Sequence, residues 1–318
     1  MGIDRNSMRN VVIIVLVLMT IGTTNGLTMN YYMFSCPLLD MVVKNYVNSA
    51  LNSDPTLAAA LLRMHFHDCW IEGCDGSVLL DSTKDNTAEK DSPANLSLRG
   101  YELIDDIKEA LEERCPGVVS CADIVAMAAR DAVFFAGGPY FEIGKGRKDG
   151  RRSKIEDTIN LPSPRFNSSD LIKQFGQRGF TVQDLVALSG GHTLGAARCV
   201  TFKDRIMNNA DPTTIDADFS RNLVKTCRGG DNSRQTFDST TNTFDNDYFV
   251  SLQRKMGLLT SDQTLFASPL TRPIVNDYAM NTAMFFLHFQ QALIKMSLME
   301  SSDSNAPREV RQNCRKVN

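Results

Sequence analysis

The spacing of apolar residues predicts a chain built almost entirely from helices. Apolar side chains recur at helical intervals in residues 38–51, 101–113, 118–135 and 273–299. In the first of these stretches the side expected to face the core carries Met41, Val42, Tyr46, Val47 and Ala50. Sustained strand-like alternation and internal repeats do not occur. We therefore predict a mostly α fold with minor β elements.

Polar stretches separate these helices, and capping residues indicate where some of the helices begin and end. The basic, glycine-rich segment 141–152 predicts a solvated loop or hairpin, and residues 211–231 predict a polar loop. Asp54 and Pro55 have the residue types of an N-cap and a first helical position, so a helix is expected to begin there. Thr181 and Asp184 predict a capping box for a helix that ends at Gly190-Gly191, immediately before His192.

The helix expected after Asp54 places a base beside a fixed positive charge. Arg63 and His67 are four residues apart, so their side chains share one helix face. This pair suits acid/base chemistry with electrostatic stabilisation. Asp68 is rotated by about 100° from His67 and must face elsewhere.

Oxygen-bearing residues follow this pair and indicate a calcium site. Asp68, Asp75 and Ser77 supply side-chain oxygens, and the turn between them offers the carbonyls of Ile71 and Gly73. Cys69 and Cys74 would close a loop over the same turn. The alternative is a transition-metal site made from His65, His67, Cys69 and Cys74.

Composition and the N-terminus indicate a secreted globular protein. The 318 residues are 42% hydrophobic, enough for one large core or two small ones, and the formal net charge of −3 does not suggest a nucleic-acid partner. Arg5 and Arg9 precede the apolar run 11–21 and the small residues near Gly26, so residues 1–26 are expected to be a signal peptide and 27–318 one mature domain. The apolar run is short for a bilayer span, which leaves a membrane anchor as the alternative.

The eight cysteines all follow the predicted leader. An even number in a secreted chain predicts four disulfides, although their pairing stays open at 105 arrangements. Asn95 and Asn167 each begin a glycosylation sequon.

Two motifs carry a resemblance to a known family. The stretches RMHFHDCWIEGCDGS and DLVALSGGHTLGAARC resemble the distal-helix and proximal-haem motifs of the secretory plant (class III) haem peroxidases, the horseradish-peroxidase-like enzymes. The resemblance spans about Tyr31 to Cys314. It implies the plant haem-peroxidase fold, with the haem between a distal and a proximal half, and two Ca²⁺ ions. Because no Cys-x-x-Cys-His occurs, one non-covalent haem b is expected.

The resemblance also implies roles for individual residues. His192 would be the axial haem ligand, with its second ring nitrogen bonded to Asp262, and Asn95 would orient His67. Glu89 would join the distal calcium site directly or through water. Asn95 would then be buried, which leaves Asn167 as the glycosylation candidate. The carbonyl of Pro162 would border the substrate channel, and the neighbouring Arg165 suggests a preference for anionic phenolic acids.

The proximal calcium site departs from the family pattern, because the interval between its two aspartates is one residue short. The expected ligands are Thr193, Asp238, Thr241 and Asp245, with Thr240 as the alternative to Thr241. The disulfides implied by the resemblance are Cys36–Cys115, Cys69–Cys74, Cys121–Cys314 and Cys199–Cys227.

The resulting hypothesis is a secreted, extracellular haem peroxidase that reduces hydrogen peroxide to water. His67 would act as base and then acid, and Arg63 would stabilise the charge that develops as the O–O bond breaks. Small phenols would supply single electrons in cell-wall or lignin-type oxidation, the oxidative-stress response or peroxide removal. A calcium-dependent wall-binding protein without catalysis and a secreted zinc hydrolase are the other classes. We expect a monomer, since no exposed apolar stripe is evident from the sequence, and no membrane anchor.

Overall fold

The computed structural model describes residues 26–206, 214–301, 303 and 305–318. The predicted signal peptide, apart from Gly26, lies outside these residues. Helices dominate, as predicted, and the strands are short. No helix among the described residues is both long enough and apolar enough to cross a membrane.

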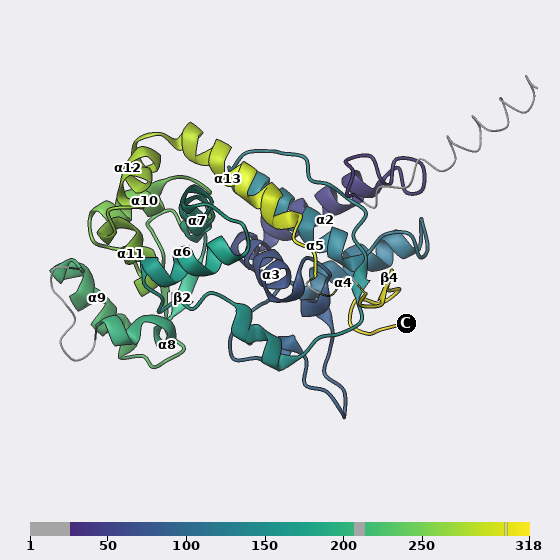
Figure 1. Ribbon diagram of the computed structural model, residues 1–318, viewed down its shortest axis with the longest axis horizontal. Helices are drawn as coiled ribbons and strands as arrows, with labels where there is room; N and C mark the ends of the chain where they lie inside the picture. The colour runs from purple at the N-terminus through teal and green to yellow at the C-terminus, as the bar shows by residue number, and fades with distance from the viewer. Residues whose placement is uncertain (1–25, 207–213, 302, 304) are drawn as a thin grey trace, which may run out of the picture.

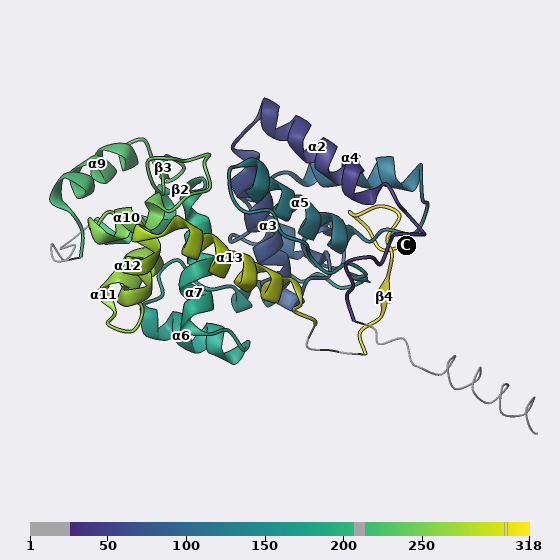
Figure 2. The same cartoon turned by 90° about the horizontal axis from the view of Figure 1, so that it is seen from above.

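The helices form two groups that lie side by side (Figures 1 and 2). The first group contains α2 (Leu39–Ser53), α3 (Leu57–Glu72), α4 (Tyr101–Glu112) and α5 (Cys121–Phe135). The second contains α6 (Ser168–Gln177), α7 (Val182–Ser189), α8 (Cys199–Phe202), α9 (Ala217–Cys227), α10 (Asp247–Gln253), α11 (Thr260–Ala267) and α12 (Arg272–Met280). Helix α13 (Thr282–Ser297) contacts both α7 and α3, and so joins the two groups.

Short 3-10 helices connect these elements and carry several candidate site residues. They are η1 (Ser77–Leu79), η2 (Glu89–Asp91), η3 (Ile155–Asn160), η4 (Gly190–Thr193) and η5 (Lys203–Arg205). Gly190 has to be glycine because a Cβ there would lie 2.4 Å from Cε2 of Phe285. This close approach holds η4 against the core.

Two small antiparallel sheets complete the fold, and one of them corrects a prediction. β2 (Ala196–Arg198) pairs with β3 (Arg234–Thr236), and β1 (Asp149–Gly150) pairs with β4 (Arg308–Glu309). The basic segment 141–152 is therefore not a solvated hairpin. Lys145 and Arg147 are buried, where Lys145 forms an ion pair with Asp40 and Arg147 one with Asp123.

Helix boundaries differ from the predictions at the start of α3 and α5. The Asp54 carboxylate does accept the backbone N–H of Thr56, as an N-cap would. The first turn closes with i→i−3 bonds, from Leu57 to Asp54 and from Ala58 to Pro55, so regular α-helix begins at Leu57 rather than Pro55. α5 begins at Cys121, where the Ser120 side chain caps it.

The predicted core face of α2 was only partly right. Val42 and Val47 are buried, whereas Met41 and Tyr46 are 52% and 38% exposed. The buried face is completed instead by Leu39, Val43 and Leu51.

Two further predictions were wrong in the C-terminal half. The region 211–231 contains α9, whose first turn is capped by Asp216 and which buries Phe219 and Leu223. The stretch 273–299 is not one helix, because the chain breaks at Asn281, whose side chain caps α13.

The monomer was expected because the sequence shows no exposed apolar stripe, and the surface of the structure corrects that reason. Met280 and Leu287, at the end of α12 and on α13, are 77% and 51% exposed, so apolar surface is present there. The oligomeric state stays a prediction.

Four disulfides close the described chain, and their pairs are the ones implied by the resemblance. They are Cys36–Cys115, Cys69–Cys74, Cys121–Cys314 and Cys199–Cys227. Cys121–Cys314 joins the first turn of α5 to the C-terminal segment. It thereby returns the end of the chain to the first group of helices, as Figure 1 shows.

Candidate active site and cation clusters

The distal pair lies on α3, at the centre of the molecule. The Nε–H of Arg63 donates to Nε2 of His67 at 3.2 Å, so the two side chains do share one helix face. Arg63 also donates to the Ser97 hydroxyl at 2.8 Å and to the Ala94 carbonyl at 2.7 Å. Sequence reasoning did not identify these two anchors, since the loop around residue 95 gives no local signal of what it contacts.

Asn95 fixes the protonation of His67. Its amide nitrogen donates to the backbone carbonyl of Glu89 at 2.8 Å, so its oxygen is the atom that faces Nδ1 of His67 at 2.6 Å. Nδ1 must then carry the proton, which leaves the lone pair on Nε2. Burial, followed by the charge of Arg63, lowers the pKa of His67 to about 3. His67 is therefore a neutral base at ordinary pH. Asn95 itself is buried, which agrees with the expectation that its sequon carries no glycan.

The proximal histidine has a different partner. Nδ1 of His192 lies 2.7 Å from Oδ1 of Asp262, a carboxylate that is 1% exposed. Asp262 also accepts the Tyr248 hydroxyl at 3.1 Å and the Leu259 N–H at 2.8 Å, the latter at the start of α11. The Asp262 carboxylate therefore orients the imidazole and at the same time caps a helix.

His192 is free on its other side. The described residues provide no hydrogen-bond partner for its Nε2, and its side chain is 40% exposed. The ring stacks on Phe237 with 4.2 Å between centroids and 6° between planes. A neutral imidazole whose Nδ1–H is bonded to a carboxylate is a strong axial ligand for haem iron, so this donor set fits a haem. The role of Phe237 was missed, although the sequence places it next to the candidate ligand Asp238.

The distal oxygen cluster is buried, and several of its side-chain oxygens have no hydrogen-bond partner among the described residues. Asp68, Asp75 and Ser77 gather around the turn after α3, with Glu89 beside them. Both carboxylate oxygens of Glu89 and the hydroxyl of Ser77 have no hydrogen-bond partner among the described residues. Unpartnered buried oxygens of this kind are costly, and a calcium ion would bind them. The residues therefore fit the predicted cation.

The electrostatics of this cluster agree with that assignment. Burial raises the pKa of Asp68 to about 8 and that of Asp75 to about 6, and it raises the pKa of Glu89 well above its usual value. Mutual repulsion adds to the shifts of Asp68 and Glu89. The carboxylates need a cation in order to ionise together.

The predicted carbonyl ligands already have one partner each. The carbonyl of Ile71 accepts from the Asn160 side chain at 3.3 Å, and that of Gly73 accepts from the Asp75 N–H at 2.8 Å. A carbonyl oxygen has two lone pairs, so each retains one for a cation.

The proximal oxygen cluster favours Thr240 over the expected Thr241. The Thr193 hydroxyl donates to Asp238 at 2.6 Å and lies 3.1 Å from Asp245. The Thr240 hydroxyl lies 3.3 Å from Asp238 and 3.1 Å from Asp245. Thr241 instead uses its backbone carbonyl to accept the Gly195 N–H. The shortened interval therefore brings Thr240, not Thr241, to the aspartates.

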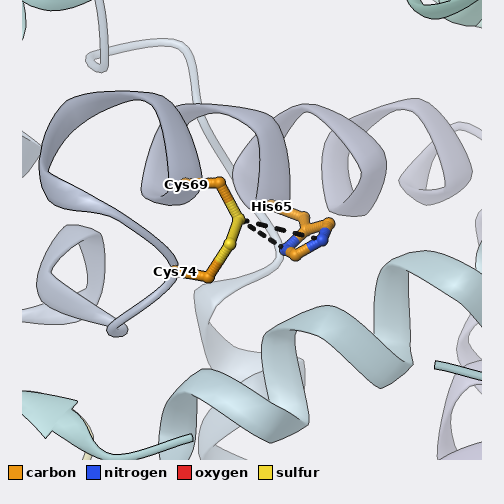
Figure 3. A group of neighbouring side chains, drawn as sticks. All are labelled: His65, Cys69 and Cys74. Carbon is orange, nitrogen blue, oxygen red and sulfur yellow. Dashed lines mark hydrogen bonds between the residues drawn. A yellow bond between two sulfur atoms is a disulfide. The ribbon is translucent and has the colours of Figure 1, made fainter. Parts of the chain in front are cut away.

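The alternative transition-metal site is excluded in the oxidised protein. His65, Cys69 and Cys74 do lie together, but the two sulfurs are bonded to each other at 1.99 Å (Figure 3). His65 contacts the Ser297 hydroxyl at 3.0 Å, on the opposite side of α3 from the Arg63 contact of His67. The four residues do not form one ligand set.

The candidate substrate edge is tied to the proximal half. Pro162 is half-buried, and the carbonyl of the nearby Pro164 accepts the Ser261 N–H at 3.1 Å, one residue before Asp262. Arg165 forms an ion pair with Asp204 at 2.7 Å. Both side chains of this pair are exposed, so the preference for anionic phenols stays a prediction.

The fold and these two histidine sites define a haem peroxidase. Residues 43–281 match the peroxidase family, and the chain belongs to this family and, within it, to the class III peroxidases of plants. It is 66% identical to Peroxidase 47 of Arabidopsis thaliana over 92% of this chain and 89% of that protein. It is 46% identical to Arabidopsis Peroxidase 64, with 98% of each covered, and 44% identical to Peroxidase RIP1 of Medicago truncatula, with 96% of each covered.

Proposed function

We propose that this peroxidase is secreted and that it oxidises small phenolic donors by one-electron steps while it reduces hydrogen peroxide to water. The geometry of the distal pair is the main support, because a neutral histidine and a fixed cation share one face of α3 at 3.2 Å. One haem b would be held by Nε2 of His192 and two Ca²⁺ ions by the distal and proximal oxygen clusters. The bound haem supplies the redox chemistry.

His67 would move one proton between the two oxygens of the peroxide. Nε2 carries the lone pair, so peroxide would replace the Arg63 N–H as its partner and give up a proton there. The same nitrogen would return that proton to the departing oxygen. Because Asn95 holds Nδ1, the ring keeps its orientation throughout the transfer.

Arg63 would stabilise the negative charge on the departing oxygen. Burial lowers the pKa of Arg63 to about 10, so the guanidinium still carries its full charge at neutral pH. Its contacts with Ser97 and Ala94 position this charge before the substrate arrives, which is the condition for electrostatic stabilisation of a transition state.

Secretion and phenolic donors rest on further observations. The apolar run after Arg9 favours a signal peptide ending at Gly26, and four disulfides suit an oxidising compartment. Asn167 is exposed, and its side-chain oxygen caps α6, which leaves the amide nitrogen available for a glycan. Pro162 would border the channel through which phenols reach the haem edge. Cell-wall oxidation, stress response and peroxide removal are all compatible with this chemistry.

The test is the visible spectrum of the purified holoenzyme before and after one equivalent of hydrogen peroxide. We expect the Soret band to shift and bleach and then to recover when a phenol is added. Recovery with phenols but not with non-phenolic reductants supports the donor class. A correctly disulfide-bonded protein without a Soret band would favour the calcium-dependent wall-binding protein instead.

A further inference from the structure

The C-terminal segment brings a buried arginine to the distal oxygen cluster. Arg311 has 0% exposure, and its Nη2 donates to the carbonyl of Gly76 at 2.6 Å. The N–H of Gly76 in turn donates to Oδ2 of Asp68 at 3.0 Å. A single residue therefore separates the guanidinium from the carboxylate cluster.

The carboxylate that pairs with this guanidinium is Asp149, which is also buried and lies beyond hydrogen-bond distance. The Nε and Nη1 of Arg311 have no hydrogen-bond partner among the described residues. Asp149 lies 3.8 Å from Nε, and its oxygens accept the backbone N–H groups of Cys121, Ala122 and Arg311 itself. Asp149 accepts no hydrogen bond from the guanidinium, and the positive charge also acts on other buried carboxylates. It lowers the pKa of Asp68 and, together with Arg308, that of Asp75, against the larger effect of burial.

The position of Arg311 is fixed from several sides. The β1–β4 pairing aligns Gly150 with Arg308, and the Gly150 N–H donates to the carbonyl of Asp75 at 2.7 Å. The Cys121–Cys314 disulfide anchors the segment three residues further along the chain. At Gly76, whose φ is +69°, a Cβ would lie 2.6 Å from Nη2 of Arg311. The C-terminal segment and the turn carrying Asp75 are therefore in close contact.

We propose that Arg311 is a positioning residue for the distal calcium loop, acting as a permanent internal counter-cation. It holds the loop closed when the ion is absent, and it weakens calcium binding by repulsion when the ion is present. This inference rests on the proposed distal calcium site. It implies that the C-terminal segment determines how tightly the distal site binds calcium.

Two opposite effects distinguish this role from simple packing. Removing the charge takes one buried counter-cation away from the carboxylates in the calcium-free protein, which lowers its stability. The same change removes a repulsion from the calcium-bound protein, and we expect about tenfold tighter calcium binding. A residue that only fills space would weaken calcium binding when replaced, because the loop would lose its shape.

The experiment compares Arg311→Met, which keeps the apolar stem, with Arg311→Lys, which keeps the charge. Lys316→Met is the matched control, because it removes a charge from the same segment at an exposed position. Each holoenzyme is depleted with a chelator and titrated with calcium by calorimetry. Thermal unfolding is followed in chelator and in excess calcium.

For Arg311→Met we expect tighter calcium binding at the distal site and a larger rise in Tm on adding calcium than in the wild type. Arg311→Lys and Lys316→Met should remain close to wild type in both. Equal losses of Tm with and without calcium, together with unchanged or weaker calcium binding, would overturn the inference. A wild-type protein that binds no calcium would instead overturn the calcium site itself.

A measurement on the wild type covers the case in which Arg311→Met does not fold. Amide hydrogen exchange is compared with and without chelator at Gly76 and Val78, whose N–H groups donate to Asp68. The inference predicts that they stay protected after calcium removal. Exchange as fast as in exposed loops would show that Arg311 does not hold the loop closed.

Discussion

The two histidines of the active site are the same side chain in two opposite settings. His67 is 7% exposed, faces a neutral amide at Nδ1 and lies beside a cation. His192 is 40% exposed on its side chain and faces a buried carboxylate at Nδ1. An amide fixes the tautomer without adding charge, so Nε2 of His67 stays a weak base that can take and return a proton. A carboxylate increases the electron density on Nε2 of His192, which suits a metal ligand.

Of the changes that test this contrast between the two histidines, replacing the distal base should have the largest effect on activity. His67→Ala removes the proton acceptor, and we expect the reaction with peroxide to slow by about 10²- to 10⁴-fold. Stopped-flow absorbance with peroxide alone measures this step. The matched control is His65→Gln, which alters a buried histidine two residues away on the other side of α3 and should react at close to the wild-type rate. If His67→Ala reacted as fast as the wild type, the assignment of the base would be wrong.

Replacing the proximal carboxylate should have a smaller effect. Asp262→Asn keeps an oxygen that can cap α11 through the Leu259 N–H, but it removes the negative charge from Nδ1 of His192. We expect about a 10- to 100-fold loss of activity or of haem affinity, together with a higher reduction potential of the iron. Spectroelectrochemistry measures the potential, and circular dichroism checks that the fold is kept. An unchanged potential in a folded variant would contradict the role given to Asp262.

The pH dependence of stability should give the smallest effect. Burial lowers the pKa of His65 and of His67 to about 3, below the value of an unfolded histidine. Between that unfolded value and pH 3 the unfolded chain binds more protons, so these two residues make the free energy of unfolding fall as the pH falls. Each contributes at most about 1.4 kcal/mol per pH unit.

Urea unfolding at several pH values below 7 measures this slope. His65→Gln should reduce the slope while leaving peroxide reactivity intact, which separates the structural histidine from the catalytic one. The same slope in His65→Gln and the wild type would show that His65 does not titrate as its burial implies.

The sequence determined the local parts of the site. Arg63 and His67 share a face because four residues make about one helical turn, and the Thr181–Asp184 capping box is present as predicted. The family motifs correctly predicted that Asn95 contacts His67 and that Asp262 contacts His192. Local chemistry was less exact about where regular helix starts: Asp54 accepts the Thr56 N–H as predicted for a cap, but the first turn has i→i−3 bonds and α3 begins at Leu57.

Only the tertiary structure decided the contacts between distant segments. Helical spacing cannot show that Thr240 rather than Thr241 meets Asp238 and Asp245, because a shortened loop changes which hydroxyl points inward. Nor can it show that a C-terminal arginine lies against Gly76, 235 residues earlier in the chain. Periodicity specifies which face of a helix is apolar, whereas the partner of a buried polar group depends on how whole segments pack, and packing is a property of the complete fold.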